Sequence, residues 1–118
     1  MKRLIIIFIV FVFLSITSAV YAHPPSDINM SFDSKTKILT AIIMHNTSNP
    51  VSHYIKKVDV GLNGKEIIEQ GISRQDNNES QTVAYLIPDV QDKDVLSVEG
   101  YCSISGKLKK EITVNLEE

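Results

Sequence analysis

The sequence predicts an all-β protein, a seven-stranded immunoglobulin-like β-sandwich. Short runs in which apolar and polar residues alternate recur along residues 23–118, roughly every ten residues. Turn-forming residues separate these runs, and no segment after residue 22 shows the apolar period of an amphipathic helix. Short strands at this spacing, with turn signals between them, are typical of a sandwich.

The first two strands are expected at residues 28–32 and 38–45. Apolar and polar side chains alternate over the first of these runs, and the polar segment 33–37 that follows indicates a turn. The second run is more continuously apolar, and it ends at a loop over 46–51 that contains the turn-forming pair Asn-Pro.

The third and fourth strands are expected at residues 54–62 and 66–72, joined by a tight hairpin. One face of the third strand is marked by Tyr54, Val58, Val60 and Leu62. Asn63-Gly64 between the two strands is the strongest local signal, because both residue types tolerate the positive φ of a type I′ turn.

The last three strands are expected at residues 83–87, 95–102 and 108–116. The polar loop 76–80 precedes the fifth strand, and Pro-Asp ends it. The alternation of apolar residues through the sixth and seventh strands completes the two-sheet pattern.

The first 22 residues have the layout of a secretory signal peptide. Lys2 and Arg3 precede an apolar run from residue 4 to 13 that continues through Leu-Ser-Ile over 14–16, and Val20-Tyr21-Ala22 fits the small-x-small cleavage rule. The alternative is an uncleaved anchor, but an apolar stretch of about 13 residues falls short of the ~20 that span a bilayer. We therefore expect a leader over 1–22, one domain over 23–118 with no membrane association after cleavage, and a periplasmic or secreted location.

Charge and cysteine content exclude several classes of protein. Without Lys2 and Arg3 the basic count falls from 12 to 10 against 14 acidic residues, so the net charge moves from −2 to −4. An acidic domain of this kind is not expected to bind nucleic acid. The single cysteine, Cys102, rules out an intrachain disulfide.

The candidate functional residues are His23, His45, His53 and Cys102. His45 closes the second expected strand and His53 opens the third, so one loop should bring both to the same end of the sandwich. Imidazole and thiolate are ligands for iron, copper and zinc. The alternative for each histidine is a solvated or capping role, and for Cys102 a place in the core, since it shares strand parity with Leu96 and Val98.

Three segments resemble one known family. His-Asn-Thr-Ser-Asn-Pro-Val-Ser-His-Tyr-Ile over residues 45–55 is similar to the His-Pro…His-Tyr-Ile segment of superoxide reductases, the neelaredoxin and desulfoferrodoxin iron domains. Tyr-Cys-Ser-Ile-Ser-Gly over 101–106 resembles their Tyr-Cys-Asn-x-His-Gly segment. The start of the mature chain, His-Pro-Pro over 23–25, resembles their early His-x-Pro.

The resemblance implies a non-haem iron site. By position, His23, His45 and His53 would be equatorial ligands and Cys102 the axial thiolate. It also implies reduction of superoxide with electrons from an unidentified donor protein, and assembly into homo-oligomers. The chain departs from the family in several features. Ser105 stands in place of its fourth histidine, and its Glu-Lys pair is missing before His23. The loop between His45 and His53 is longer than in the family and lacks the proline directly after the first histidine, and there is no rubredoxin-like CxxC domain.

Other functions stay open beside superoxide reduction. After cleavage the α-amine of His23 could replace the missing histidine nitrogen, since a metal readily displaces the proton of an amine. The same residues could also form a non-catalytic site for iron, copper or zinc. A purely structural domain of the periplasm, with Cys102 in the core, is the third alternative.

Overall fold

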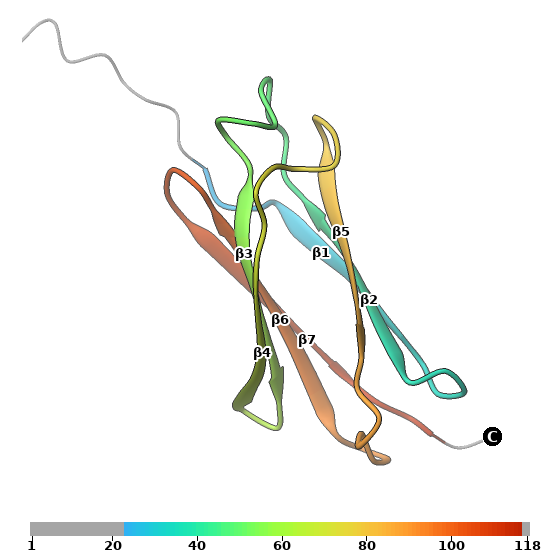
Figure 1. Cartoon of the computed structure of the whole chain (residues 1–118). Coiled ribbons are helices and arrows are strands. Elements are labelled where there is room, and N and C mark those ends of the chain that lie inside the picture. Colours follow the sequence, from blue (N-terminus) through green and yellow to red (C-terminus); the bar gives the residue numbers. More distant parts are fainter. Residues whose placement is uncertain (1–22, 117–118) are drawn as a thin grey trace, which may run out of the picture.

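The computed structural model describes residues 23–116, so the predicted leader over 1–22 lies outside the described part of the chain. Seven strands follow one another without a helix between them (Figure 1). Their bounds are β1 Asp27–Asp33, β2 Ile38–Met44, β3 Ile55–Leu62, β4 Lys65–Gly71, β5 Ser80–Leu86, β6 Val95–Cys102 and β7 Lys107–Thr113. Among the described residues there is no helix that could cross a membrane.

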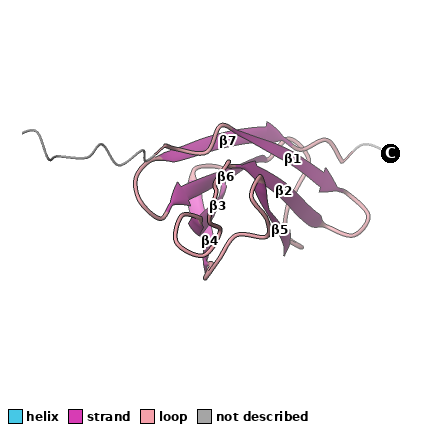
Figure 2. Ribbon diagram, turned by 90° about the horizontal axis from the view of Figure 1, so that it is seen from above, coloured by secondary structure: helices cyan, strands magenta, loops and turns pink. Residues whose placement is uncertain are grey.

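The strands form two antiparallel sheets, with orders β1-β2-β5 and β4-β3-β6-β7. Strands one, two and five thus lie in one sheet and strands three, six and seven in the other, as in immunoglobulin-like sandwiches. Seen from above, β1, β2 and β5 lie opposite β3, β4 and β6, and β7 lies beside β1 (Figure 2). The sandwich predicted from the sequence is confirmed.

The core fills the space between the two sheets. Alternate residues of each strand point inward because successive side chains of a strand lie on opposite faces. The fully enclosed residues of this core are Ile28, Leu39, Ala41, Ile43, Ile55, Val58, Val60, Leu96 and Val98. Both sheets contribute to this set, which is the packing expected of a sandwich.

The third strand differs from its predicted pattern at its beginning. The inward-facing set starts at the buried Ile55, and Tyr54 is only half-buried. The reason is an irregularity in the pairing with β6, where the register shifts between Ile55 and Lys57. Because one extra residue reverses the faces of a strand, simple alternation fails across this shift.

The predicted hairpin between β3 and β4 is confirmed. Asn63 has a φ of 52° and Gly64 a φ of 84°, so both residues adopt the left-handed conformation that this turn requires. The side chain of Asn63 ties the turn to the start of β6, since its Oδ1 accepts a hydrogen bond of 2.8 Å from the Val95 N–H.

Replacing Gly64 by valine is expected to lower the free energy of unfolding by about 1 kcal/mol or more, because a β-branched residue resists positive φ. Gly71 is the matched control, since it has no positive φ and no atom within 4 Å of an added Cβ. Urea unfolding of Gly64→Val and Gly71→Val would measure the difference. Equal midpoints for the two variants would contradict the role of Gly64.

Candidate metal centre

The strand order brings the three histidines to one end of the sandwich. His45 directly follows β2, and His53 precedes β3 by two residues, so both flank the β2–β3 connection. The described chain begins at His23, and this beginning lies at the same end as that connection and the β6–β7 turn (Figure 1).

The three imidazole rings form one compact cluster. The ring centroids of His23 and His45 lie 4.8 Å apart, those of His23 and His53 5.0 Å, and those of His45 and His53 4.7 Å. One ring nitrogen from each residue can be chosen so that all three lie within 4.8 Å of one another. Three nitrogen ligands at this spacing could bind a single metal ion.

Cys102 lies at the end of β6, and its Sγ does not belong to this group of mutually close ligand atoms. The residue is 3% exposed and pairs across the sheet with Ile55. It shares the inward face of β6 with Leu96 and Val98, as its strand parity indicates. The structure therefore brings three of the four predicted ligands together and places the thiol at the edge of the core.

Gln75, which no pattern in the sequence indicates, contacts the buried ring of His45. His45 is 1% exposed, and its Nδ1 lies 2.9 Å from the Gln75 Oε1. Gln75 is itself 3% exposed although it lies in the loop between β4 and β5. Gln75 lies in a polar loop 30 residues from His45, so no local sequence pattern indicates this contact.

Two ring nitrogens of the cluster are buried without a hydrogen-bond partner among residues 23–116. They are the Nε2 atoms of His45 and His53. Burying a polar atom without a partner costs about 1–3 kcal/mol. Because most buried polar atoms in proteins are satisfied, two such atoms in contacting rings indicate a ligand that accepts their lone pairs.

The surroundings favour the neutral form of the His45 and His53 rings. Burial lowers the pKa of His45, against an opposing contribution from its hydrogen bond with Gln75. Burial also lowers the pKa of His53, and the charges of His45 and His23 add to that effect. A metal binds the neutral imidazole, so lowered pKa values favour a metal site near neutral pH.

The metal-free protein is expected to lose stability as the pH falls below about 6.5, the ordinary histidine pKa. The pKa values of His45 and His53 are lower in the folded state. The unfolded chain therefore takes up protons first, and the stability present above this pH is lost as the pH falls toward the folded-state values. The carboxyl groups with lowered pKa values titrate only at more acidic pH: Asp27, Asp33 and Asp94.

Urea unfolding at about pH 7.5 and about pH 5.5, on either side of that pKa, would measure this loss. The unfolding midpoint should fall at the lower pH. The fall should be smaller in a variant with glutamine at both His45 and His53. An unchanged wild-type midpoint would contradict the lowered pKa values.

The first described residues are held against the β6–β7 turn. Gly106 has a φ of 92°, and an added Cβ there would lie 2.9 Å from the Pro24 nitrogen. The glycine therefore leaves room for Pro24 to pack closely beside it, which fixes the backbone next to His23. The His23 Nδ1 lies 3.2 Å from the Pro24 carbonyl oxygen, so Nδ1 donates there and Nε2 is left as the ligand atom. A chelate with the α-amine of His23 would need Nδ1 instead.

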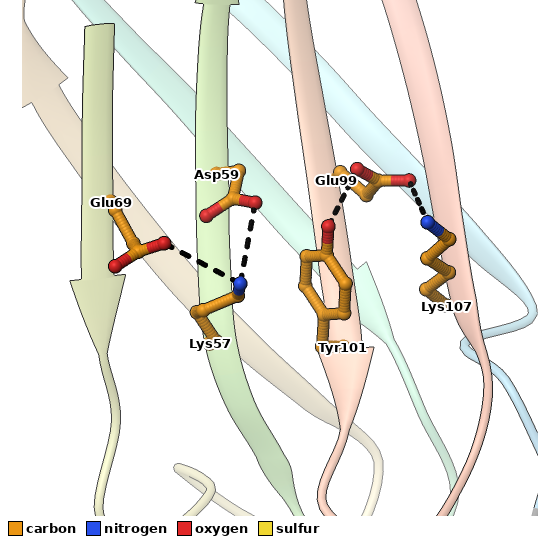
Figure 3. A network of polar contacts seen from close by, with 6 residues as sticks. All are labelled: Lys57, Asp59, Glu69, Glu99, Tyr101 and Lys107. Atoms are coloured by element: carbon orange, nitrogen blue, oxygen red, sulfur yellow. Dashed lines mark hydrogen bonds and ion pairs between the residues drawn. The ribbon is translucent and has the colours of Figure 1, made fainter. Parts of the chain in front are cut away.

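A second group of close ligand atoms lies on the outer face of the four-stranded sheet and comprises Asp59, Glu66 and Glu69. The Lys57 Nζ lies 3.6 Å from the Asp59 carboxylate and 3.4 Å from that of Glu69 (Figure 3). The same Nζ lies 4.3 Å from the centroid of the Tyr101 ring. The lysine thus partly balances the charge of these carboxylates, although the Asp59 Oδ1 is buried without a hydrogen-bond partner among residues 23–116.

Comparison with known proteins adds no assignment. No family model matches the chain, and a search of the curated proteins finds no match.

Proposed function

We propose that this protein is an exported metal-binding domain whose three histidines hold one transition-metal ion. The buried Nε2 atoms of His45 and His53, which lack partners among the described residues, are the observation that supports this most directly. A metal ion bonded to both lone pairs would remove the cost of burying them. The ring of His23 supplies the third nitrogen.

Iron is the metal we propose, on the resemblance to superoxide reductases. Imidazole nitrogens suit iron, and an added thiolate from Cys102 would raise the electron density on it. Copper and zinc also bind imidazole, so they are the alternatives for the same residues. Bound iron would supply one-electron redox chemistry.

Reduction of superoxide is the activity we propose for the iron form. Partial exposure of the cluster supports this activity, because His45 is enclosed whereas neither His23 nor His53 is fully buried. A small oxidant would approach from the side of these two residues. Superoxide would take up one electron, delivered by an unidentified donor protein, and two protons to give hydrogen peroxide. Without an electron donor the domain would be a non-catalytic metal-binding module.

Metal analysis tests the proposal. Protein expressed from the full sequence with its own leader should be purified from the exported fraction, and its N-terminus should be sequenced. We expect one ion per chain, or one equivalent of Fe²⁺ bound anaerobically by the metal-free protein. The iron form should then consume superoxide without releasing dioxygen. A protein that binds none of Fe²⁺, Cu²⁺ and Zn²⁺ would refute the metal centre.

Replacing Cys102 by serine tests the thiolate separately. Because Cys102 is almost fully buried, the hydroxyl is expected to lower the free energy of unfolding by about 1–3 kcal/mol. If the thiolate is a ligand, Co²⁺ bound to the wild type should show a sulfur-to-metal charge-transfer band that Cys102→Ser lacks. A wild-type Co²⁺ spectrum without that band would place Cys102 in the core alone.

A further inference from the structure

The orientation of the buried Gln75 amide is fixed by its neighbours. Its Nε2 donates to the carbonyl oxygen of His45 at 2.7 Å and to that of Asn77 at 2.9 Å. A carbonyl oxygen can only accept a hydrogen bond. The amide nitrogen must therefore point at these two oxygens, and the amide oxygen must point the other way.

The amide oxygen in turn determines where His45 carries its proton. Gln75 Oε1 accepts a hydrogen bond from the Ile55 backbone N–H at 3.2 Å and lies 2.9 Å from the His45 Nδ1. An oxygen that only accepts requires a hydrogen on that Nδ1. A neutral imidazole has one ring hydrogen, so the Nε2 of His45 has a free lone pair. This is the same Nε2 that is buried without a partner.

We propose that Gln75 is a positioning residue, which holds His45 in the Nδ1–H form so that Nε2 is always available to the metal. The inference rests on the proposed metal centre. The hydrogen bond at one ring nitrogen sets which nitrogen binds a metal, and partners of this kind orient the ring. Among the three histidines, only His45 has such a buried side-chain partner within residues 23–116.

Gln75 also joins the segments that carry two of the ligands. Its backbone N–H donates to the Pro50 carbonyl oxygen at 3.0 Å, within the loop between His45 and His53. Its side chain reaches the end of β2 through His45 and the start of β3 through Ile55. Gln75 therefore fixes both ends of that loop and its middle, which holds the ring of His45 and the backbone around His53 in place before metal arrives.

The first experiment needs no variant. Nitrogen-15 NMR of the rings in the metal-free full-length protein, at a pH where His45 is neutral, reports which nitrogen carries the hydrogen. We expect the Nδ1–H form for His45. A ring with its hydrogen on Nε2, or one that exchanges between the two forms, would overturn the inference even if the protein binds metal.

The second experiment compares Gln75→Met with Gln81→Met. Gln81 is a matched control, since it is also buried, at 6% exposure, and its amide bonds to Asp76 and Thr82 rather than to a histidine. Zn²⁺ affinity should fall by about 10–100-fold in Gln75→Met, which is typical of losing such a partner. The Zn²⁺ affinity of Gln81→Met should stay within about threefold of the wild-type affinity, which is a smaller change than the loss expected for Gln75→Met.

The outcomes separate the two proposals. A wild type that binds no Zn²⁺, Cu²⁺ or Fe²⁺ refutes the metal centre itself. Two other results would refute only the positioning role of Gln75. In the first, the wild type and Gln75→Met bind Zn²⁺ equally well. In the second, the wild type binds Zn²⁺ and both variants lose affinity to the same extent. The NMR result on the wild type decides the case in which Gln75→Met does not fold.

Discussion

Replacing His53 by alanine is expected to weaken metal binding by about 100-fold or more, while the stability of the metal-free protein stays the same or rises. The loss of a direct ligand should exceed the roughly 10–100-fold effect of losing a partner of a ligand. The ring of His53 makes no hydrogen bond with another described residue, and its Nε2 is buried without a partner. Removing it therefore breaks no polar contact and relieves an unfavourable burial.

Ser52→Ala is the control for this variant, because it changes the neighbouring exposed residue and leaves all three rings in place. Zn²⁺ titration of both variants measures metal affinity, and urea unfolding without metal measures stability. Two results would contradict the site: unchanged affinity in His53→Ala, or a marked loss of stability without metal, which would mean that the ring serves the fold.

Replacing Gly106 by alanine is expected to affect stability and metal binding together. The φ of 92° disfavours any residue with a Cβ, at a cost of about 1–2 kcal/mol. The added Cβ would also lie 2.9 Å from the Pro24 nitrogen and 3.0 Å from its Cα, which is too close for backbone atoms that do not move. Pro24 must shift, and His23 next to it should leave the cluster.

We therefore expect Gly106→Ala to lower the free energy of unfolding by about 1–2 kcal/mol or more. Its Zn²⁺ affinity should fall as far as that of His23→Ala. Gly71→Ala is the control, since that position has ordinary φ and open space around it. Full Zn²⁺ affinity in Gly106→Ala would show that the metal centre does not depend on the packing of Pro24.

Much of the fold could be predicted from local patterns. Alternating side chains reveal strands because only one face of each strand is buried, and Asn63-Gly64 reveals its turn because few residues accept positive φ. The exception at Tyr54 has a non-local cause. The shift in pairing between Ile55 and Lys57 depends on β6, the neighbouring strand in the same sheet, which lies about forty residues further along the chain.

The candidate site, too, could be predicted from the sequence only in part. The sequence by itself predicted that His45 and His53 lie at the same end of the sandwich, because one loop joins the end of β2 to the beginning of β3. Only the tertiary structure decided that Gln75 contacts His45, that Gly106 holds Pro24 beside His23, and that the Cys102 Sγ lies outside the group of three imidazoles. Each of these depends on how distant loops pack at one end of the sandwich. Such packing produces no periodic pattern in the sequence, because it involves single residues rather than every second residue of a strand.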